Sequence, residues 1–277
     1  MWIRILSAIG MAVLLVPGAI FSDSVYFIIL FVLLGLIGEF EMLRCLGLHK
    51  NAVISAPAYL LAAAGPIAAR YIFHGGDAFF RYAFPAIALG ALIIFAGYTF
   101  SHGKVSLEQC GAAIASTLFI AAAFTSVVLL HDMEETGRYV YLLVFIASWV
   151  TDTFAYFTGR LFGKHKLIPD VSPKKTVEGA IGGIVFCVVG FIVYALILRA
   201  MGTITEVRYA VLVIGGIFAS VISMVGDLMM SAIKRARGIK DYGRIFPGHG
   251  GVLDRFDSVM AVSVCILLLE VCTDLLK

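Results

Sequence analysis

The sequence predicts an all-α, polytopic integral membrane protein with about nine transmembrane helices. Of its 277 residues, 61% are hydrophobic and only 14% are charged, and the mean hydropathy is +1.00. A soluble domain of this length has about 45–50% apolar and about 25% charged residues. Apolar runs of about 20 residues recur along the chain, and an α-helix needs this length to cross a bilayer. We therefore expect most side chains to face lipid or neighbouring helices.

The predicted spans follow one another with short connections. They cover roughly residues 4–21, 25–43, 52–73, 80–99, 110–131, 138–159, 177–200, 207–230 and 252–275. The run 4–21 has the length of a signal peptide, but similar runs follow it and we expect it to be retained. Pro57 and Pro66 in the third span and Pro85 in the fourth predict kinks.

Lys and Arg are distributed unevenly between the two sides of the predicted bundle. Most of the 21 lie at the N-terminus or in the connections after the second, fourth, sixth and eighth spans, and ten lie in the connections 160–176 and 231–250. The positive-inside rule therefore predicts a cytoplasmic N-terminus and two cytoplasmic basic connections. These connections either anchor the protein at anionic lipid or bind phosphate groups, and both hold if the substrate is an anionic lipid.

Four aspartates lie inside predicted spans, where a charge is costly unless it faces a polar cavity or a partner. Asp152 lies in the sixth span, Asp227 lies in the eighth, and Asp254 and Asp257 open the ninth. The last two are three residues apart and share one helix face. Together with Asp227 they predict a Mg²⁺ or Mn²⁺ site, because both ions prefer oxygen ligands. The alternative is that these aspartates form ion pairs with basic side chains at the helix ends.

The two basic connections contain further candidates. Pro247–Gly251 is a glycine-rich turn before a helix, where backbone N–H groups can approach an anion. In the other connection, Lys174 and Lys175 offer two cations, and Thr176 is predicted to cap the following helix. The alternative for both is a positively charged flank with ordinary turns and caps.

Glu39 and Glu41 lie at the cytoplasmic end of the second span, and Arg44 follows Glu41 by three residues. This spacing predicts an ion pair between Glu41 and Arg44 at the helix end rather than a catalytic role.

The segment 231–257 contains S-A-I-K-R, four further residues, K-D, and then P-G-H-G-G-V-L-D-R-F-D. At every fixed position it resembles the signature of phosphatidate cytidylyltransferases, also called CDP-diacylglycerol synthases. D-T-F-A-Y-F-T-G-R-L-F-G-K from Asp152 and S-P-K-K-T-V-E-G from Ser172 are similar to a second conserved block of that family. The resemblance covers the chain from about residue 148 onward; earlier residues match only in hydropathy, with a faint likeness at E-M-L-R, residues 41–44.

The resemblance implies an enzyme of phospholipid biosynthesis, a nucleotidyltransferase that transfers the cytidylyl group of CTP to phosphatidate and releases pyrophosphate. It implies dependence on a divalent cation, Mg²⁺ or Mn²⁺, with a monovalent cation such as K⁺ beside it. It implies a homodimer in a bacterial-type inner (plasma) membrane, without nucleic acid. Residues 1–137 would form a scaffold of about five helices and residues 138–277 a catalytic region of about four.

The resemblance also implies roles for individual residues. The metal ligands are Asp227, Asp254 and Asp257. The catalytic set comprises these three with Lys234, Arg235, Lys240, Asp241 and His249. The substrate-binding set comprises Asp152, Ser172, Lys174, Lys175, Thr176, Glu178, Gly250, Gly251 and Arg255. A metal and several basic groups suit this chemistry, because two polyanionic substrates repel each other.

Two other function classes compete with this one. Another CTP-using membrane enzyme, such as a polyprenol kinase or a cytidylyltransferase acting on an ether lipid, would bind the same nucleotide. The K-D to H-G-G-x-x-D-R-x-D segment argues against the kinases. A cation-coupled transporter also carries intramembrane aspartates. It needs polar residues in both halves, whereas the first five predicted spans are almost free of charge.

Overall fold

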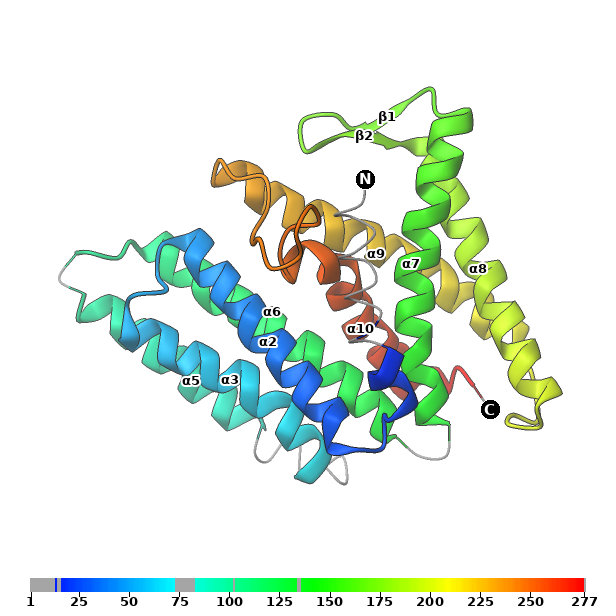
Figure 1. Cartoon of the computed structure of the whole chain (residues 1–277), viewed down its shortest axis with the longest axis horizontal. Coiled ribbons are helices and arrows are strands. Elements are labelled where there is room, and N and C mark those ends of the chain that lie inside the picture. Colours follow the sequence, from blue (N-terminus) through cyan, green and yellow to red (C-terminus); the bar gives the residue numbers. More distant parts are fainter. Residues whose placement is uncertain (1–12, 14–15, 73–82, 102, 134–135, 277) are drawn as a thin grey trace. The chain divides into compact units, whose positions relative to one another are not determined.

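The computed structural model describes residues 13, 16–72, 83–101, 103–133 and 136–276 and consists almost entirely of helices (Figure 1). Seven helices in this part of the chain are long and apolar enough to span a membrane. They are α2 Val25–Leu46, α3 Ala52–Tyr71, α6 Leu107–Asp132, α7 Gly137–Phe162, α8 Val177–Ala200, α9 Tyr209–Ala236 and α10 Leu253–Thr273. The predicted all-α polytopic architecture is thereby confirmed.

Two predicted spans differ from these seven helices. The fourth corresponds to α5 Phe84–Thr99, which has 16 residues and is shorter than the other apolar helices. The first, 4–21, lies mostly outside the described residues. The predicted total of about nine spans is therefore not confirmed by the described part of the chain.

The chain forms two compact units, which are described separately below. The first contains Met1–Leu129 together with Arg237–Arg255, and the second contains Leu130–Ala236 together with Phe256–Lys277. The basic, glycine-rich segment before α10 therefore belongs to the same unit as the N-terminal helices. The predicted functional division at residues 137 and 138 stays a prediction, and the compact units do not coincide with it.

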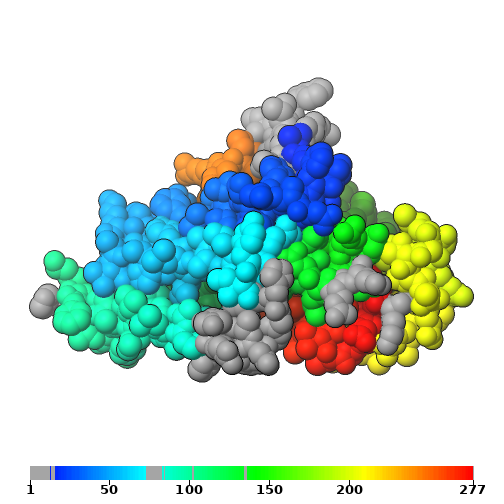
Figure 2. Space-filling model, turned by 90° about the horizontal axis from the view of Figure 1, so that it is seen from below, coloured from blue at the N-terminus to red at the C-terminus, as the bar shows by residue number. Residues whose placement is uncertain are grey.

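In the first unit, α2, α3, α5 and α6 pack closely through small residues. A Cβ atom on Gly35 of α2 would lie 3.1 Å from the Ala62 carbonyl oxygen of α3, and one on Gly65 of α3 would lie 2.1 Å from Thr125 Oγ1 of α6. Without these side chains the helix backbones approach each other, which is how membrane helices gain packing energy. Figure 2 shows α2 in blue and α3 in light blue side by side on one face of this unit.

In the second unit, α7, α8, α9 and most of α10 use the same principle. A Cβ atom on Gly183 of α8 would lie 3.1 Å from the Thr151 carbonyl oxygen of α7. At Gly226 of α9, a Cβ atom would lie 2.6 Å from the Ala261 Cβ and 3.0 Å from the Asp257 carbonyl oxygen. Glycine at position 226 therefore allows α9 and α10 to meet beside two of the intramembrane aspartates.

A short β-hairpin joins α7 to α8, where the sequence predicted only a basic connection. Its strands are β1 Lys166–Ile168 and β2 Ser172–Thr176, which pair antiparallel with Lys166 opposite Thr176. Figure 1 shows the hairpin at the adjoining ends of the two helices. Pro173 lies in β2, and a two-stranded sheet tolerates it because every strand in such a sheet is an edge strand.

Candidate active site

The hairpin and the first turn of α8 are fixed by local hydrogen bonds. The Gly179 N–H donates to Thr176 Oγ1 at 3.1 Å, which confirms the predicted helix cap. The Glu178 carboxylate accepts from the His165 N–H and lies 2.7 Å from His165 Nδ1. Thr176 and Glu178 therefore shape the hairpin, and their predicted substrate contacts stay predictions.

Lys175 connects the hairpin to α9 within the second unit. Its Nζ lies 2.6 Å from Asp227 Oδ2, and about a quarter of each side chain is exposed. Asp227 also accepts a hydrogen bond from Ser231 Oγ, one helical turn later, at 3.2 Å. Lys174, the neighbour of Lys175 in β2, is exposed. The structure thus brings together one predicted phosphate-binding lysine and one predicted metal ligand.

A second acidic group lies where α10 passes α7. Ser258 connects the two helices, because its Oγ donates to Asp152 Oδ2 at 3.2 Å while its N–H donates to Asp257 Oδ1 at 2.9 Å. Asp257 also interacts electrostatically with Asp227, Asp152 and Lys234. Two other predicted site carboxylates of the second unit, Asp227 and Asp152, therefore lie within electrostatic range of Asp257.

The basic residues after Asp227 lie partly in a helix rather than in a connection. The sequence predicted that the eighth span ends at residue 230, but α9 continues to Ala236 and includes Lys234 and Arg235. Lys234 is buried, whereas Arg235 is exposed. A lysine side chain can extend along an apolar helix surface toward a charged partner, so burial of Lys234 is tolerated.

In the first unit, Asp254 holds the loop that precedes α10. Its Oδ2 accepts the Tyr242 N–H at 2.7 Å and the Gly251 N–H at 2.9 Å. The loop also closes on itself, because the Phe246 N–H donates to the Gly250 carbonyl oxygen at 2.9 Å. Asp254 and Tyr242 are both buried. Asp254 thus has a structural task within its own unit, and its predicted role as a metal ligand stays a prediction.

The N–H groups at the start of α10 also have protein partners. Glu41 of α2 accepts the Val252 N–H at 3.1 Å and the Leu253 N–H at 2.9 Å. The sequence suggested that this glycine-rich turn presents N–H groups to a phosphate. In the structure a protein carboxylate takes the place of the anion at this helix start. The substrate contacts predicted for Gly250 and Gly251 remain untested.

Glu41 is the site-adjacent residue that sequence reasoning missed. Arg44 interacts electrostatically with Glu41, as the spacing predicted, but the direct contacts of both residues are elsewhere: Glu41 accepts backbone N–H groups of the loop and α10, and Arg44 donates to the Tyr242 carbonyl oxygen. The spacing of the two residues in α2 favoured a local pair. The sequence feature that pointed to a role for Glu41 was the faint likeness to the family at E-M-L-R, residues 41–44.

The remaining predicted residues are placed as follows. Arg255, Lys240 and Asp241 are exposed in the first unit, and His249 is partly buried in the loop. Ser172 is partly buried in β2.

The donor set can be compared with the needs of a divalent cation. In the described part of the chain, no group of three or more His, Cys, Asp or Glu side chains is arranged to hold a metal ion. Proteins usually bind Mg²⁺ with one or two carboxylates together with substrate phosphates. Asp227 and Asp257 fit that chemistry, because they are oxygen donors whose charges interact within one unit.

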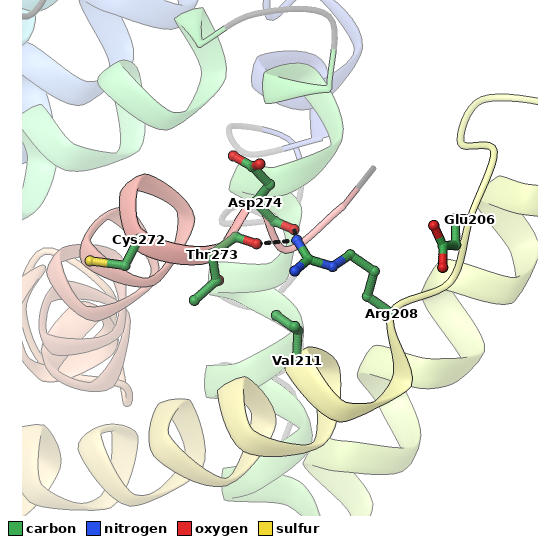
Figure 3. A pocket seen from close by; sticks show the side chains of 6 residues that line it. All are labelled: Glu206, Arg208, Val211, Cys272, Thr273 and Asp274. Carbon is green, nitrogen blue, oxygen red and sulfur yellow. Dashed lines mark hydrogen bonds between the residues drawn. The ribbon is translucent and has the colours of Figure 1, made fainter.

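An open cavity in the second unit is lined by none of these residues. It has a volume of about 500 Å³ and is lined by Glu206, Arg208, Val211, Cys272, Thr273 and Asp274, at the C-terminal end of α10 (Figure 3). Arg208 donates there to the Thr273 carbonyl oxygen and, at 3.1 Å, to the Asp274 carbonyl oxygen. Its guanidinium therefore caps the helix end, and none of the predicted site residues lines the cavity.

The fold defines a polytopic membrane protein in whose second unit carboxylates and lysines lie within electrostatic range of Asp227 and Asp257. The model of the cytidylyltransferase family matches residues 2–272, and the chain belongs to this family. It is 33% identical over 240 residues to the phosphatidate cytidylyltransferase of Bacillus subtilis (strain 168), which covers 85% of each chain. It is 31% identical over 264 residues to that of Staphylococcus aureus (strain COL), covering 95% of this chain and 96% of the relative. The Staphylococcus saprophyticus protein is 38% identical over 162 residues, covering 58% and 59%.

Proposed function

We propose that this protein transfers the cytidylyl group of CTP to phosphatidate, forming CDP-diacylglycerol and pyrophosphate. The match of nearly the whole chain to the cytidylyltransferase family, with relatives named phosphatidate cytidylyltransferase, carries this proposal. The charged groups of the second unit support it, because they suit substrates that both carry phosphates.

The reaction is a displacement at phosphorus. A phosphate oxygen of phosphatidate attacks the α-phosphorus of CTP and forms the new P–O bond. The bond from the α-phosphorus to the oxygen that bridges to the β-phosphate breaks, and pyrophosphate leaves with that electron pair. The lipid phosphate is itself the nucleophile, so the protein has to position two anions and needs no covalent intermediate.

The basic residues near Asp227 suit this task. Lys175 and Lys234 carry positive charge next to the acidic group, and exposed Lys174 and Arg235 extend it toward solvent. These cations would offset the repulsion between the triphosphate and the lipid phosphate as the substrates approach. Lys240 and His249 are proposed to contact phosphates from the loop before α10.

A divalent cation, Mg²⁺ or Mn²⁺, is part of the proposal. Asp227 and Asp257 would hold it, with Asp254 as a further ligand. When bound, such an ion polarises phosphoryl oxygens and stabilises developing charge. A monovalent cation such as K⁺ beside it is an expectation from the family resemblance.

The proposal also covers the orientation of the protein in the membrane and its oligomeric state. The hairpin and the loop before α10 would face the cytoplasm with the N-terminus, because these segments concentrate the positive charge and CTP is a cytoplasmic substrate. The protein would act as a homodimer. The molecular mass of the purified protein in detergent, corrected for bound detergent, tests that part.

The test uses purified protein, phosphatidate and CTP labelled at either the α- or the γ-phosphate, with and without Mg²⁺. We expect label from the α-phosphate in a lipid product only when phosphatidate is present, and label from the γ-phosphate only in pyrophosphate. Label from the γ-phosphate in the lipid would identify a kinase instead. If folded protein forms no lipid product under any condition, the proposal is wrong and a transporter becomes the leading alternative.

A further inference from the structure

Helix α2 contacts the connection between α9 and α10 at two points, Tyr242 and the residues at the start of α10. At the first point, Arg44 donates a hydrogen bond to the Tyr242 carbonyl oxygen. At the second, Glu41 accepts hydrogen bonds from the N–H groups of Val252 and Leu253. Since 211 residues separate Glu41 from Val252, these are long-range contacts of tertiary structure. One helical turn of α2 therefore holds the segment 242–253 at both of its ends.

Burial strengthens the hydrogen bonds that the Glu41 carboxylate accepts from the start of α10. The side chain is only 1% exposed, so its charge has to be balanced inside the protein. The first N–H groups of a helix have no partner within the helix, and they carry the positive end of the helix dipole. Two such donors on one carboxylate are charge-assisted hydrogen bonds, which are shorter and stronger than neutral ones.

Two loop glycines leave space for this carboxylate. A Cβ atom at Gly243 would lie 2.0 Å from Glu41 Oε1, and one at Gly251 would lie 2.1 Å from the same oxygen. The next glycine, Gly250, has a φ of +86°, and its Cβ would lie 2.6 Å from Asp254 Oδ2. Steric exclusion by Glu41 and Asp254 thus explains why the turn lacks side chains at these points, without any ligand.

Packing adds to the hydrogen bonds. A Cβ atom on Gly38 of α2 would lie 3.1 Å from Leu253 Cδ2, so the first turn of α10 lies against the same helix face that carries Glu41. Asp254 directly follows Leu253 and turns back to the N–H groups of Tyr242 and Gly251. The position of the Asp254 carboxylate consequently depends on contacts made by α2.

We propose that Glu41 and Arg44 are positioning residues, which act through the loop 242–253 to orient the start of α10 and the Asp254 carboxylate. The catalytic consequence rests on the proposed function, whereas the structural consequence does not. Neither residue is assigned to contact CTP or lipid. They resemble the outer-shell partners of a metal or phosphate site, whose loss typically reduces activity or metal affinity roughly 10–100-fold.

The decisive variants are Glu41→Gln and Arg44→Met. The amide NH₂ of a Gln side chain cannot accept a hydrogen bond, so Glu41→Gln leaves one of the two N–H groups without its acceptor. Arg44 is exposed, so Arg44→Met should fold even if the buried Glu41 variant does not. Glu39→Gln is the matched control, because Glu39 lies buried in the same helix but accepts from Thr117 Oγ1 at 2.7 Å, a bond that Gln retains.

Hydrogen exchange of the purified protein, followed by mass spectrometry, reports the loop directly. We expect faster exchange in the peptide that contains Val252 and Leu253 for Glu41→Gln, and in the peptide that contains Tyr242 for Arg44→Met. Glu39→Gln should exchange like the parent protein in both peptides. Unchanged exchange in both test variants would refute the positioning role even if the parent enzyme is active.

Steady-state kinetics then test the catalytic consequence. We expect kcat to fall roughly 10–100-fold in both test variants with little change in KM for CTP, since neither residue binds the nucleotide. A rise in KM for CTP at unchanged kcat would instead indicate direct nucleotide contact. If the parent protein lacks cytidylyltransferase activity, the exchange experiment still decides whether α2 positions the loop.

Discussion

Lys175 Nζ lies 2.6 Å from Asp227 Oδ2, so a lysine of the hairpin neutralises an aspartate in a membrane-spanning helix. An opposite charge at this distance stabilises both ions where solvation is weak. The same carboxylate is a proposed metal ligand, and the same ammonium group is a proposed phosphate ligand. In the absence of other ions the two satisfy each other. Binding of a cation and CTP would exchange this pair for contacts with the substrates.

The first prediction concerns the lysines of β2. Lys175→Gln should raise KM for CTP at least about tenfold, because it removes a phosphate-binding cation that also fixes Asp227. Lys174→Gln should have a smaller effect, because the Lys174 side chain is exposed and screened by solvent. Initial rates at varied CTP concentration make the comparison. Equal effects of the two substitutions would contradict a special role for Lys175.

The second prediction concerns the divalent cation. Asp227→Asn and Asp257→Asn should each raise the Mg²⁺ concentration for half-maximal activity by roughly 10–100-fold. Chelation of divalent ions should abolish lipid product in the parent protein, and added Mg²⁺ should restore it. Asp170→Asn serves as the control, because Asp170 lies exposed in the hairpin turn. An unchanged Mg²⁺ requirement in both test variants would remove these residues from the metal site.

The third prediction concerns the contact between α9 and α10. Gly226→Ala should destabilise the protein by about 1–3 kcal/mol, because the new methyl group would overlap Ala261 and press on the α10 backbone. At Gly111 of α6 a Cβ atom meets nothing within 4 Å, so Gly111→Ala should leave stability unchanged or raise it by up to about 1 kcal/mol. Thermal unfolding in detergent compares the two variants. Similar melting temperatures would mean that α9 and α10 do not need this close approach.

The fourth prediction concerns orientation. Cysteines introduced at Asp170 in the hairpin and at Thr205 before α9 lie at opposite ends of α8. A membrane-impermeant maleimide should label Thr205→Cys in intact cells, and Asp170→Cys only after the membrane is permeabilised. The parent protein, which has five native cysteines, supplies the background. The reverse pattern would place the basic segments outside the cell.

Hydropathy alone predicted much of the helical fold. The predicted span 177–200 coincides with α8 Val177–Ala200, and 25–43 lies within α2. The β-hairpin was missed because its strands are short and basic, and they do not show the alternation of apolar and polar residues typical of longer strands. The helical extension that carries Lys234 was missed because charged residues ended the apolar run before the helix ended.

The candidate site was less predictable than the helices. Spacing along one helix shows that Asp254 and Asp257 share a face, because that geometry is local. It could not show that Glu41 contacts the start of α10, since an apolar helix does not encode which neighbour it meets. Composition also made the glycine-rich turn look like a phosphate cradle, whereas Gly243 and Gly251 leave room for the Glu41 carboxylate.

The long sequence separation between Glu41 and Val252 imposes an order on biogenesis. A ribosome makes the chain from its N-terminus, so Glu41 is synthesised 211 residues before Val252. Until then its carboxylate has to remain hydrated at the membrane surface or carry a proton. The bonds to α10 form only when the last helix arrives, so a prematurely terminated chain can insert its early helices but cannot assemble this loop. In such a chain the Glu41 carboxylate would lack the N–H donors of Val252 and Leu253.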